Sequence, residues 1–228
     1  MTKNTTPDTG QQVLITGATG MVGSLILHNC LADDRVNKVL SLVRKNTPNP
    51  HPKLHEIVVS DFANYDAIEV LFQEVSIIYF CIGVYTGAVD RERFRTITVT
   101  YPVKLAEAVH RQSPNAHFCL LSGSGADRTE KSSMAFAKDK GVAENLLSAL
   151  DFNQFYSFRP GYIYPVKERK EPNFSYRLMR YLYPLLKILG PNFSITSEEL
   201  AKAMFETGFK SFPTEVFENA EILAVLKA

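Results

Sequence analysis

The sequence predicts an α/β protein built as a three-layer, doubly wound parallel sheet with helices on both faces. Two observations predict this architecture. Short β-rich runs alternate with longer segments of helical period, which is the pattern of parallel strands joined by crossover helices. A glycine-rich turn at residues 16–23 also links the first of these strands to the first helix. Ligands of such folds bind at the edge where the strands have their carboxyl ends.

The expected elements follow one another in that alternation. The first strand, residues 13–16, begins with Val13-Leu14-Ile15, and the first helix, residues 20–32, carries Leu25, Ile26 and Leu27. Right-handed crossovers then give the doubly wound arrangement. The remaining strands are expected at residues 38–43, 56–59, 77–82, 117–121 and 156–159, and the remaining helices at residues 65–72, 98–111 and 137–150.

The sequence of the C-terminal part predicts a region on the substrate side of the site. Residues 176–189 are apolar and broken by Pro184, which predicts two short helices that line a pocket or form a partner-binding face. Thr196 and Glu199 have the spacing of a capping box and predict the start of another helix. Residues 220–228 are expected to dock on the body as a helix or strand.

Composition indicates one compact domain, residues 11–228, after a flexible N-terminus of residues 1–10. The chain has 228 residues, 45% of them hydrophobic, and a formal net charge of +1. That charge gives no global field to attract nucleic acid. We expect neither a signal peptide nor a membrane partner, because the N-terminus is polar and no apolar run reaches about 18 residues. Three singly placed cysteines, Cys30, Cys81 and Cys119, indicate buried thiols in a reducing compartment. The cytoplasm is therefore the default location.

The glycine-rich turn predicts a pyrophosphate site. Gly17 allows the tight turn, Gly20 lets the backbone approach the phosphates, and Gly23 lets the helix pack closely on the strand. Unpaired N–H groups at the helix start face the anion. The expected binding residues are Gly17, Thr19, Gly20, Met21, Val22 and Gly23.

The end of the second strand indicates which dinucleotide binds. An acidic residue there binds the ribose of NAD, whereas a basic one pairs with the 2′-phosphate of NADP. This strand runs into Arg44 and Lys45, so NADP is favoured and NAD is the alternative. Asp61 and Phe62, after the third strand, are expected beside the adenine, and Cys81, Ile82 and Gly83, after the fourth strand, beside the ribose.

Several short motifs carry a family resemblance. They are residues 16–23, Asp61-Phe62, Leu121-Ser122-Gly123-Ser124-Gly125-Ala126-Asp127, Lys140-Gly141 and Phe158-Arg159-Pro160-Gly161. With them the chain resembles the atypical, extended-like short-chain dehydrogenases/reductases, in particular the family of the human Tat-interacting-protein oxidoreductase. The resemblance implies a cytosolic NAD(P)-binding Rossmann fold with a small substrate-side region, residues 162–195.

The same resemblance implies roles for individual residues. Ser124 corresponds to the active-site serine, and Lys140 to the lysine of the Tyr-x-x-x-Lys pair. Pro160, Gly161 and Ile163 are implied to lie near the nicotinamide.

The position of the family's catalytic tyrosine holds Phe136, which cannot transfer a proton. Tyr85, Tyr162 and Tyr164 are the nearby phenols that remain as substitutes, although aromatic residues at strand ends mostly pack. Two functions therefore stay open. One is an oxidoreductase acting on a small carbonyl or alcohol; the other is a non-catalytic dinucleotide-binding module that associates with a protein partner or with itself.

Other site chemistries are disfavoured. Ser124 lacks the glycine of a hydrolase elbow at position 122, and no histidine follows His117, so a hydrolase triad is excluded. We expect no metal site, because His51 and His55 are too few ligands and the prolines around them argue against the helix that would align them. The basic residues at 167–170 and 177–180 are interpreted as a solvated loop and helix face, not as a nucleic-acid site.

Overall fold

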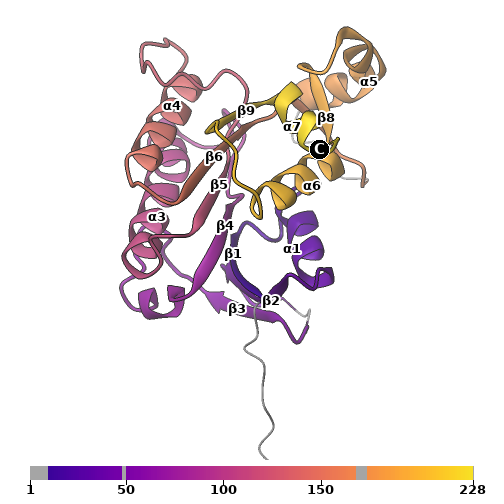
Figure 1. Cartoon of the computed structure of the whole chain (residues 1–228). Coiled ribbons are helices and arrows are strands. Elements are labelled where there is room, and N and C mark those ends of the chain that lie inside the picture. The colour runs from indigo at the N-terminus through magenta and orange to yellow at the C-terminus, as the bar shows by residue number, and fades with distance from the viewer. Residues whose placement is uncertain (1–9, 48–49, 168–173, 228) are drawn as a thin grey trace, which may run out of the picture.

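The central feature of the molecule is a seven-stranded parallel sheet in the order β3-β2-β1-β4-β5-β6-β9. The computed structural model describes residues 10–47, 50–167 and 174–227. Helices cover both faces of the sheet (Figure 1), which confirms the predicted doubly wound α/β class. The strands of this sheet are β1 (Gln11–Thr16), β2 (Val36–Val43), β3 (Leu54–Val58), β4 (Val75–Phe80), β5 (His117–Leu121), β6 (Gln154–Arg159) and β9 (Val216–Glu218).

The helices form two layers around this sheet (Figure 1). On one side lie α3 (Tyr101–Gln112) and α4 (Ala135–Ser148), and on the other lie α1 (Gly23–Ala32), α6 (Ser197–Thr207) and α7 (Asn219–Val225). The last of these shows that the C-terminal segment docks as a helix. Short helical segments complete the layers: η1 (Glu69–Phe72), α2 (Arg91–Arg95) and the π-helical η2 (Thr96–Thr100).

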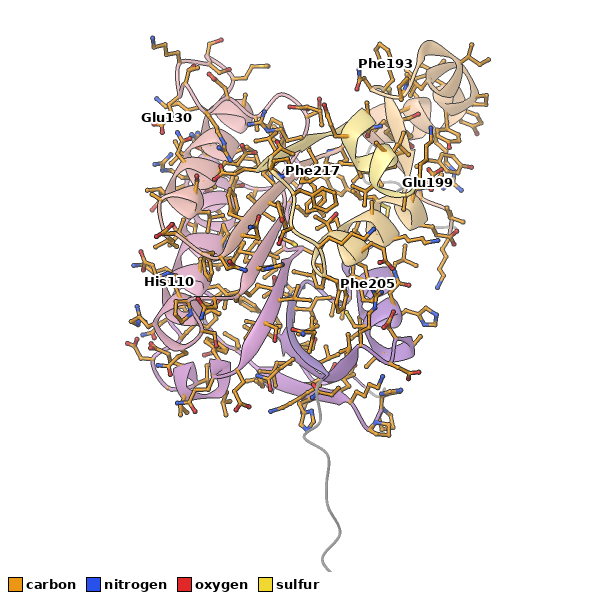
Figure 2. All side chains as sticks on the ribbon, viewed as in Figure 1. His110, Glu130, Phe193, Glu199, Phe205 and Phe217 are labelled. Atoms are coloured by element: carbon orange, nitrogen blue, oxygen red, sulfur yellow. The ribbon has the colours of Figure 1, made fainter. Side chains whose placement is uncertain are left out.

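Successive side chains of each strand point to opposite faces of the sheet, so the molecule has two hydrophobic cores, one under each helix layer. Val13 and Ile15 of β1 face the core under α1 and α6, whereas Leu14 between them faces the core under α3. Phe205 and Phe217 lie between the sheet and the helices on the α6 side (Figure 2). The same core joins distant parts of the chain, since the Tyr79 hydroxyl of β4 donates to the Phe205 carbonyl at 2.7 Å.

Two expected helices differ in the structure. Residues 65–72 form only the 3-10 segment η1, because the Asp61 and Asn64 side chains accept backbone N–H bonds that compete with a helix. The expected helix 98–111 begins with the π turn η2, in which the Tyr101 N–H donates to the Thr96 carbonyl. Pro102 has no N–H for the carbonyl four residues before it, which accounts for the irregular turn at that point.

Beyond β6 the chain builds a second small unit. It consists of β7 (Tyr162–Tyr164), α5 (Phe174–Leu189) and β8 (Ser194–Thr196), with β7 and β8 paired in parallel. The expectation of two short helices is wrong, because α5 continues through Pro184. Pro184 is exposed, and α5 carries both the loss of one backbone hydrogen bond and the crowding of the ring against the carbonyl four residues before it. The predicted capping box is confirmed: Thr196 accepts from the Glu199 N–H at 3.1 Å, and Glu199 accepts from the Thr196 N–H at 2.9 Å.

Candidate functional site

The turn between β1 and α1 is held by contacts between backbone segments. Gly17 has a φ of +72°, and a Cβ there would lie 2.7 Å from the Cys81 carbonyl oxygen. A Cβ on Gly23 would overlap the Gly17 carbonyl. Gly20, whose N–H donates to the Gly17 carbonyl at 2.9 Å, has only that same carbonyl oxygen within 4 Å of its Cβ position. Two of the three glycines are therefore required by the fold, and Gly20 is left bordering open space.

The residues of this turn fit a pyrophosphate. A side chain on Gly20 would fill the space beside the backbone, and the first turn of α1 carries no acidic residue and no side-chain cap that would compete with an anion. The N–H groups of a helix start have no intrahelical acceptors. Thr19, Met21 and Val22 lie on this turn as the sequence predicted, so the turn has the geometry of an anion cradle.

The expected adenine side holds exposed basic residues. Arg44 and Lys45 directly follow β2, are exposed, and form no salt bridge within the described residues. Asp61 is exposed, and its carboxylate accepts from the Ala63 N–H at 2.9 Å. The Phe62 ring is buried against Tyr101, with ring centroids 5.8 Å apart, so only the backbone of Phe62 is available to a ligand.

The segment after β4 lies beside the glycine turn. Strand β4 ends at Phe80, earlier than the expected 77–82, but the Cys81 N–H still donates to the Thr16 carbonyl at 3.2 Å. Burial raises the pKa of the Cys81 thiol to about 12, so this group is an inert part of the wall. Ile82 is half-buried, and Gly83 has nothing within 4 Å of its Cβ position, which leaves room for a ribose.

Helix α4 presents Phe136, Lys140 and Glu144 on one face, because they are spaced by four residues. The Phe136 ring lies against Gly123, whose Cβ position is 3.0 Å from the ring Cζ, and its centroid is 6.4 Å from that of Phe94. The Lys140 ammonium donates to the carbonyl of Leu121, the last residue of β5, at 3.3 Å. Burial lowers the pKa of Lys140 to about 8, against the opposing attraction of Glu144.

Ser124 stands exposed at the same edge of the sheet. Its backbone N–H donates to the Pro160 carbonyl at 3.1 Å, which ties the segment after β5 to the segment after β6. The structure therefore brings together Ser124, Lys140 and Phe136, the three positions that the resemblance assigns to catalysis. Proton transfer from the third is excluded by its side chain.

The residues after β6 join the site to the small unit. Gly161 donates its N–H to Asn219 at 2.8 Å, and a Cβ on it would lie 2.6 Å from the Phe193 carbonyl oxygen. Pro160 is buried, and Ile163 lies in β7 packed on the core. Tyr164 stacks on Tyr183 of α5, with centroids 3.9 Å apart and an interplanar angle of 18°, and so serves as a wall. Tyr85 and Tyr162 are half-buried near the same edge.

Glu144 anchors a polar cluster that the sequence reasoning missed. This buried carboxylate accepts from Ser122 at 2.6 Å and from Ser157 at 2.7 Å, and it pairs with Arg128 and Arg159. Burial alone would raise the pKa of Glu144, but these hydrogen bonds hold it below its usual range. The signal was its position, one turn beyond Lys140 on the same helix face.

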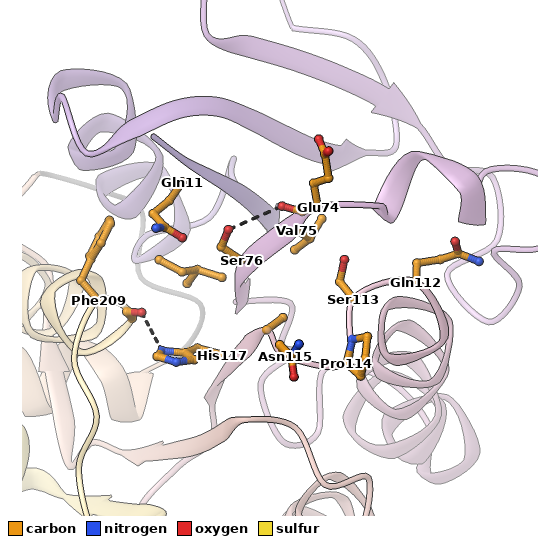
Figure 3. A pocket seen from close by; sticks show the side chains of 13 residues that line it. Gln11, Glu74, Val75, Ser76, Gln112, Ser113, Pro114, Asn115, His117 and Phe209 are labelled. Carbon is orange, nitrogen blue, oxygen red and sulfur yellow. Dashed lines mark hydrogen bonds between the residues drawn. The ribbon is translucent and has the colours of Figure 1, made fainter. Parts of the chain in front are cut away.

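A second cavity lies away from this site. It is a groove of about 570 Å³ at the amino ends of β1, β4 and β5, the edge opposite the glycine turn (Figure 3). Its polar groups bond within the protein: Ser76 donates to the Glu74 carbonyl, and His117 pairs with the Gly208 carbonyl at 2.9 Å. Across the described ranges, we find no cluster of three or more potential metal ligands. None of the helices described there has the length and apolar character needed to cross a membrane.

A protein-family model, two known proteins and a solved structure are similar to this chain. Residues 13–165 match the model of the NAD dependent epimerase/dehydratase family. Protein HTATIP2 of Rattus norvegicus is 27% identical over 164 residues, covering 71% of this chain and 66% of the rat protein. Protein fmp52, mitochondrial, of Emericella nidulans is 28% identical over 220 residues and covers 92% of both chains. A short-chain dehydrogenase from Burkholderia cenocepacia J2315 in complex with NADP has a TM-score of 0.66 at 15% identity, covering 97% of this chain and 93% of its own.

These matches confirm the resemblance drawn from the motifs, and they correct one expectation. The expected cytoplasmic location is overturned, because the fmp52 relatives, among them those of Emericella nidulans and Aspergillus clavatus, are named as mitochondrial proteins. A polar N-terminus and the lack of a long apolar run are features that a mitochondrial protein can share with a cytoplasmic one, so composition could not separate the two locations.

Proposed function

This chain belongs to the NAD-dependent epimerase/dehydratase family, and from that premise we propose that it is an NADP(H)-dependent oxidoreductase of a small carbonyl or alcohol. The observation that carries the proposal is the convergence of the glycine turn, Ser124 and Lys140 at the carboxyl ends of the strands. Two observations support a nicotinamide dinucleotide as the cofactor. The family is NAD dependent, and the space beside the Gly20 backbone, which a Cβ would fill, fits a pyrophosphate.

The preference for NADP rests on Arg44 and Lys45. Both are exposed at the end of β2 without a salt bridge among the described residues, so their charges are available to a 2′-phosphate. Arginine offers a planar fork that matches a phosphate, and no acidic residue stands at the position that would bind the ribose of NAD.

In the proposed reaction, the protein binds and orients while the dinucleotide supplies or accepts hydride. The turn at Gly20 holds the pyrophosphate, and Lys140 binds on the nicotinamide ribose side. Ser124, exposed and tied through its backbone to Pro160, donates a hydrogen bond to the substrate oxygen. Phe136 contributes an apolar wall and no proton, so we expect slow turnover.

Phe136 is the one observation that favours the alternative, a dinucleotide-binding module without turnover. The exposed serine and the half-buried lysine beside it are groups that such a module does not need. We therefore place the oxidoreductase first.

The names of the fmp52 relatives also support a mitochondrial location for this chain. Fractionation of cells that express the full chain tests this, since mitochondrial proteins separate from the soluble cell fraction.

The test of the function uses dinucleotide binding and turnover together. Wild-type protein should bind NADPH, seen as an increase in melting temperature, and should oxidise it slowly with a panel of aldehydes and ketones. Phe136→Tyr adds a hydroxyl beside Lys140 and should raise the rate by about 10² or more, the usual value of a positioned general acid. Phe136→Leu is the matched control and should not raise it. Brisk turnover by the wild type that Phe136→Tyr leaves unchanged would remove Phe136 from the catalytic position, and Tyr85, Tyr162 or Tyr164 would then be the acid to test.

A further inference from the structure

Lys140 lies at the strand end that leads to Ser124, and the position of the family's tyrosine on its helix holds Phe136. Its ammonium lies at the end of β5, bonded to the Leu121 carbonyl three residues before Ser124. One turn earlier on the same helix face, Phe136 closes the site against Gly123 with a ring that can neither donate nor accept a proton. Among the described side chains of this helix face, the lysine is the one acid next to the exposed serine.

We propose that Lys140 itself is the proton donor to the substrate oxygen in this chain. The proposal rests on the proposed function and deepens it. In reduction, the carbonyl carbon gains hydride from the reduced dinucleotide, which becomes oxidised, and the electron pair of the C=O bond moves to oxygen. That oxygen takes a proton from the Lys140 ammonium, directly or through one water. The neutral amine then regains its proton from solvent, and the reverse reaction uses the amine as base.

The carboxylates nearest Lys140 are already paired with arginines. On its own helix, Glu144 already pairs with Arg128 from the segment after β5 and with Arg159 from β6. On the α2 side, the buried Asp139 already pairs with both Arg91 and Arg95. Within the described chain, Lys140 therefore has no carboxylate at salt-bridge distance.

Burial favours release of the Lys140 proton and outweighs the opposing attraction of Glu144. It lowers the pKa of Lys140 to about 8, which places the group near the range where a general acid is efficient at neutral pH. A surface lysine with a pKa near 10.4 would hold its proton too tightly to be a useful donor. The surroundings of this lysine thus suit both holding a proton at pH 7 and giving it up.

The deciding variant is Lys140→Arg. Arginine keeps the positive charge for the ribose but does not give up a proton in this pH range. We expect kcat for carbonyl reduction to fall by about 10² or more, while the Kd for NADPH changes by less than about fivefold. Lys138→Arg, on the exposed side of the same helix, is the matched control and should change neither value. In a Phe136→Tyr background, the loss from Lys140→Arg should be smaller, because the tyrosine then donates.

Two further readouts separate donation from a merely positional role. The kcat/KM of the wild type for reduction should fall as pH rises through the pKa of Lys140, since the charged form is the donor. NMR of protein with 13C-labelled lysine, with the Lys140 signal assigned through Lys140→Arg, should show that Lys140 titrates with a pKa of about 8.

The outcomes are distinct. Wild-type protein that fails to bind any nicotinamide dinucleotide removes the proposed function and this donor with it. Protein that binds NADPH but reduces nothing at pH 6, where Lys140 is charged, overturns the oxidoreductase and the donor together and leaves dinucleotide binding standing. A Lys140→Arg variant as active as Lys138→Arg, or a Lys140 signal that titrates with the surface lysines, overturns the donor role alone.

Discussion

The glycine turn and the unit β7–α5–β8 are built by different means on the same edge of the molecule. In the turn, backbone meets backbone: positions 17 and 23 have no space for a Cβ. The unit is held by side chains such as the stacked rings of Tyr164 and Tyr183, and it leaves Tyr181 and Ile188 about four-fifths exposed. A ligand that contacts backbone leaves a glycine signature in the sequence, whereas a ligand that contacts adaptable side chains leaves none. The proposed cofactor half of the site is accordingly more specific in sequence than the proposed substrate half.

The largest expected effect breaks the turn itself. Gly23→Ala puts a methyl group into the Gly17 carbonyl, and neither backbone segment can yield without moving β1 or α1. We expect a loss of about 3 kcal/mol in the free energy of unfolding. Chemical denaturation measures it, with the exposed neighbour Ser24→Ala as the control that should stay within about 0.5 kcal/mol. Equal stability of the two variants would show that the close approach at Gly23 is not required.

A second change in the same turn separates folding from binding. Gly20→Val should abolish dinucleotide binding and leave a folded protein, because its Cβ meets only the Gly17 carbonyl oxygen, at 3.1 Å, and the rest of the side chain enters the open space beside the backbone. Circular dichroism and an NADPH titration check the two halves of this expectation. Undiminished NADPH affinity in a folded variant would show that the turn is structural only.

A smaller effect is expected at the adenine end. Arg44→Ala should weaken NADP binding by on the order of 1.5 to 3 kcal/mol and leave NAD binding nearly unchanged, because a charge-assisted contact to the 2′-phosphate is lost. Calorimetric titration with both dinucleotides measures the difference. Lys202→Ala, exposed on α6, controls for general loss of positive charge. If the wild type binds both dinucleotides equally well, Arg44 has no part in selection.

The smallest effect is expected in the β7–α5–β8 unit. Tyr183→Ala removes the ring that stacks on Tyr164, which should cost about 1 kcal/mol in stability and raise KM for the substrate more than it lowers dinucleotide affinity. Tyr183→Phe keeps the ring and should match the wild type. A variant that loses dinucleotide binding as severely as Gly20→Val would erase the contrast between the two regions.

The strands β1 to β6 and the glycine turn could be predicted from the sequence, whereas β9 and the course of α5 could not. Strands β1 to β6 and the turn were predictable, because branched apolar runs and glycines at this spacing are typical of a parallel strand that leads into a helix. Strand β9 has only three residues and pairs late with β6, so nothing local marks it. Helix α5 was misjudged at Pro184, because a proline inside a helix disfavours it locally without always ending it.

Within the site, the sequence identified Lys140 and Phe136 but missed Glu144. Lys140 was assigned through the family resemblance and Phe136 by counting four residues back from it, and the structure places both at the edge of the sheet. Glu144 was missed because its four partners come from β6 and the segments after β5, which spacing alone cannot connect. A charged residue at a position of helical period that otherwise points into the core was the available signal.

The contact between Tyr79 and Phe205 also bears on the order in which the molecule can be completed during synthesis. These residues are separated by 126 positions, and α6 packs against α1, the helix that begins at the glycine turn. A nascent chain that has emerged only to residue 196 contains every position proposed to bind the cofactor but none of α6, the helix that packs on the outside of α1. Dinucleotide affinity should therefore arise only after α6 has been made, and a chain truncated before Ser197 should be prone to aggregation, because the core under α1 would stay open.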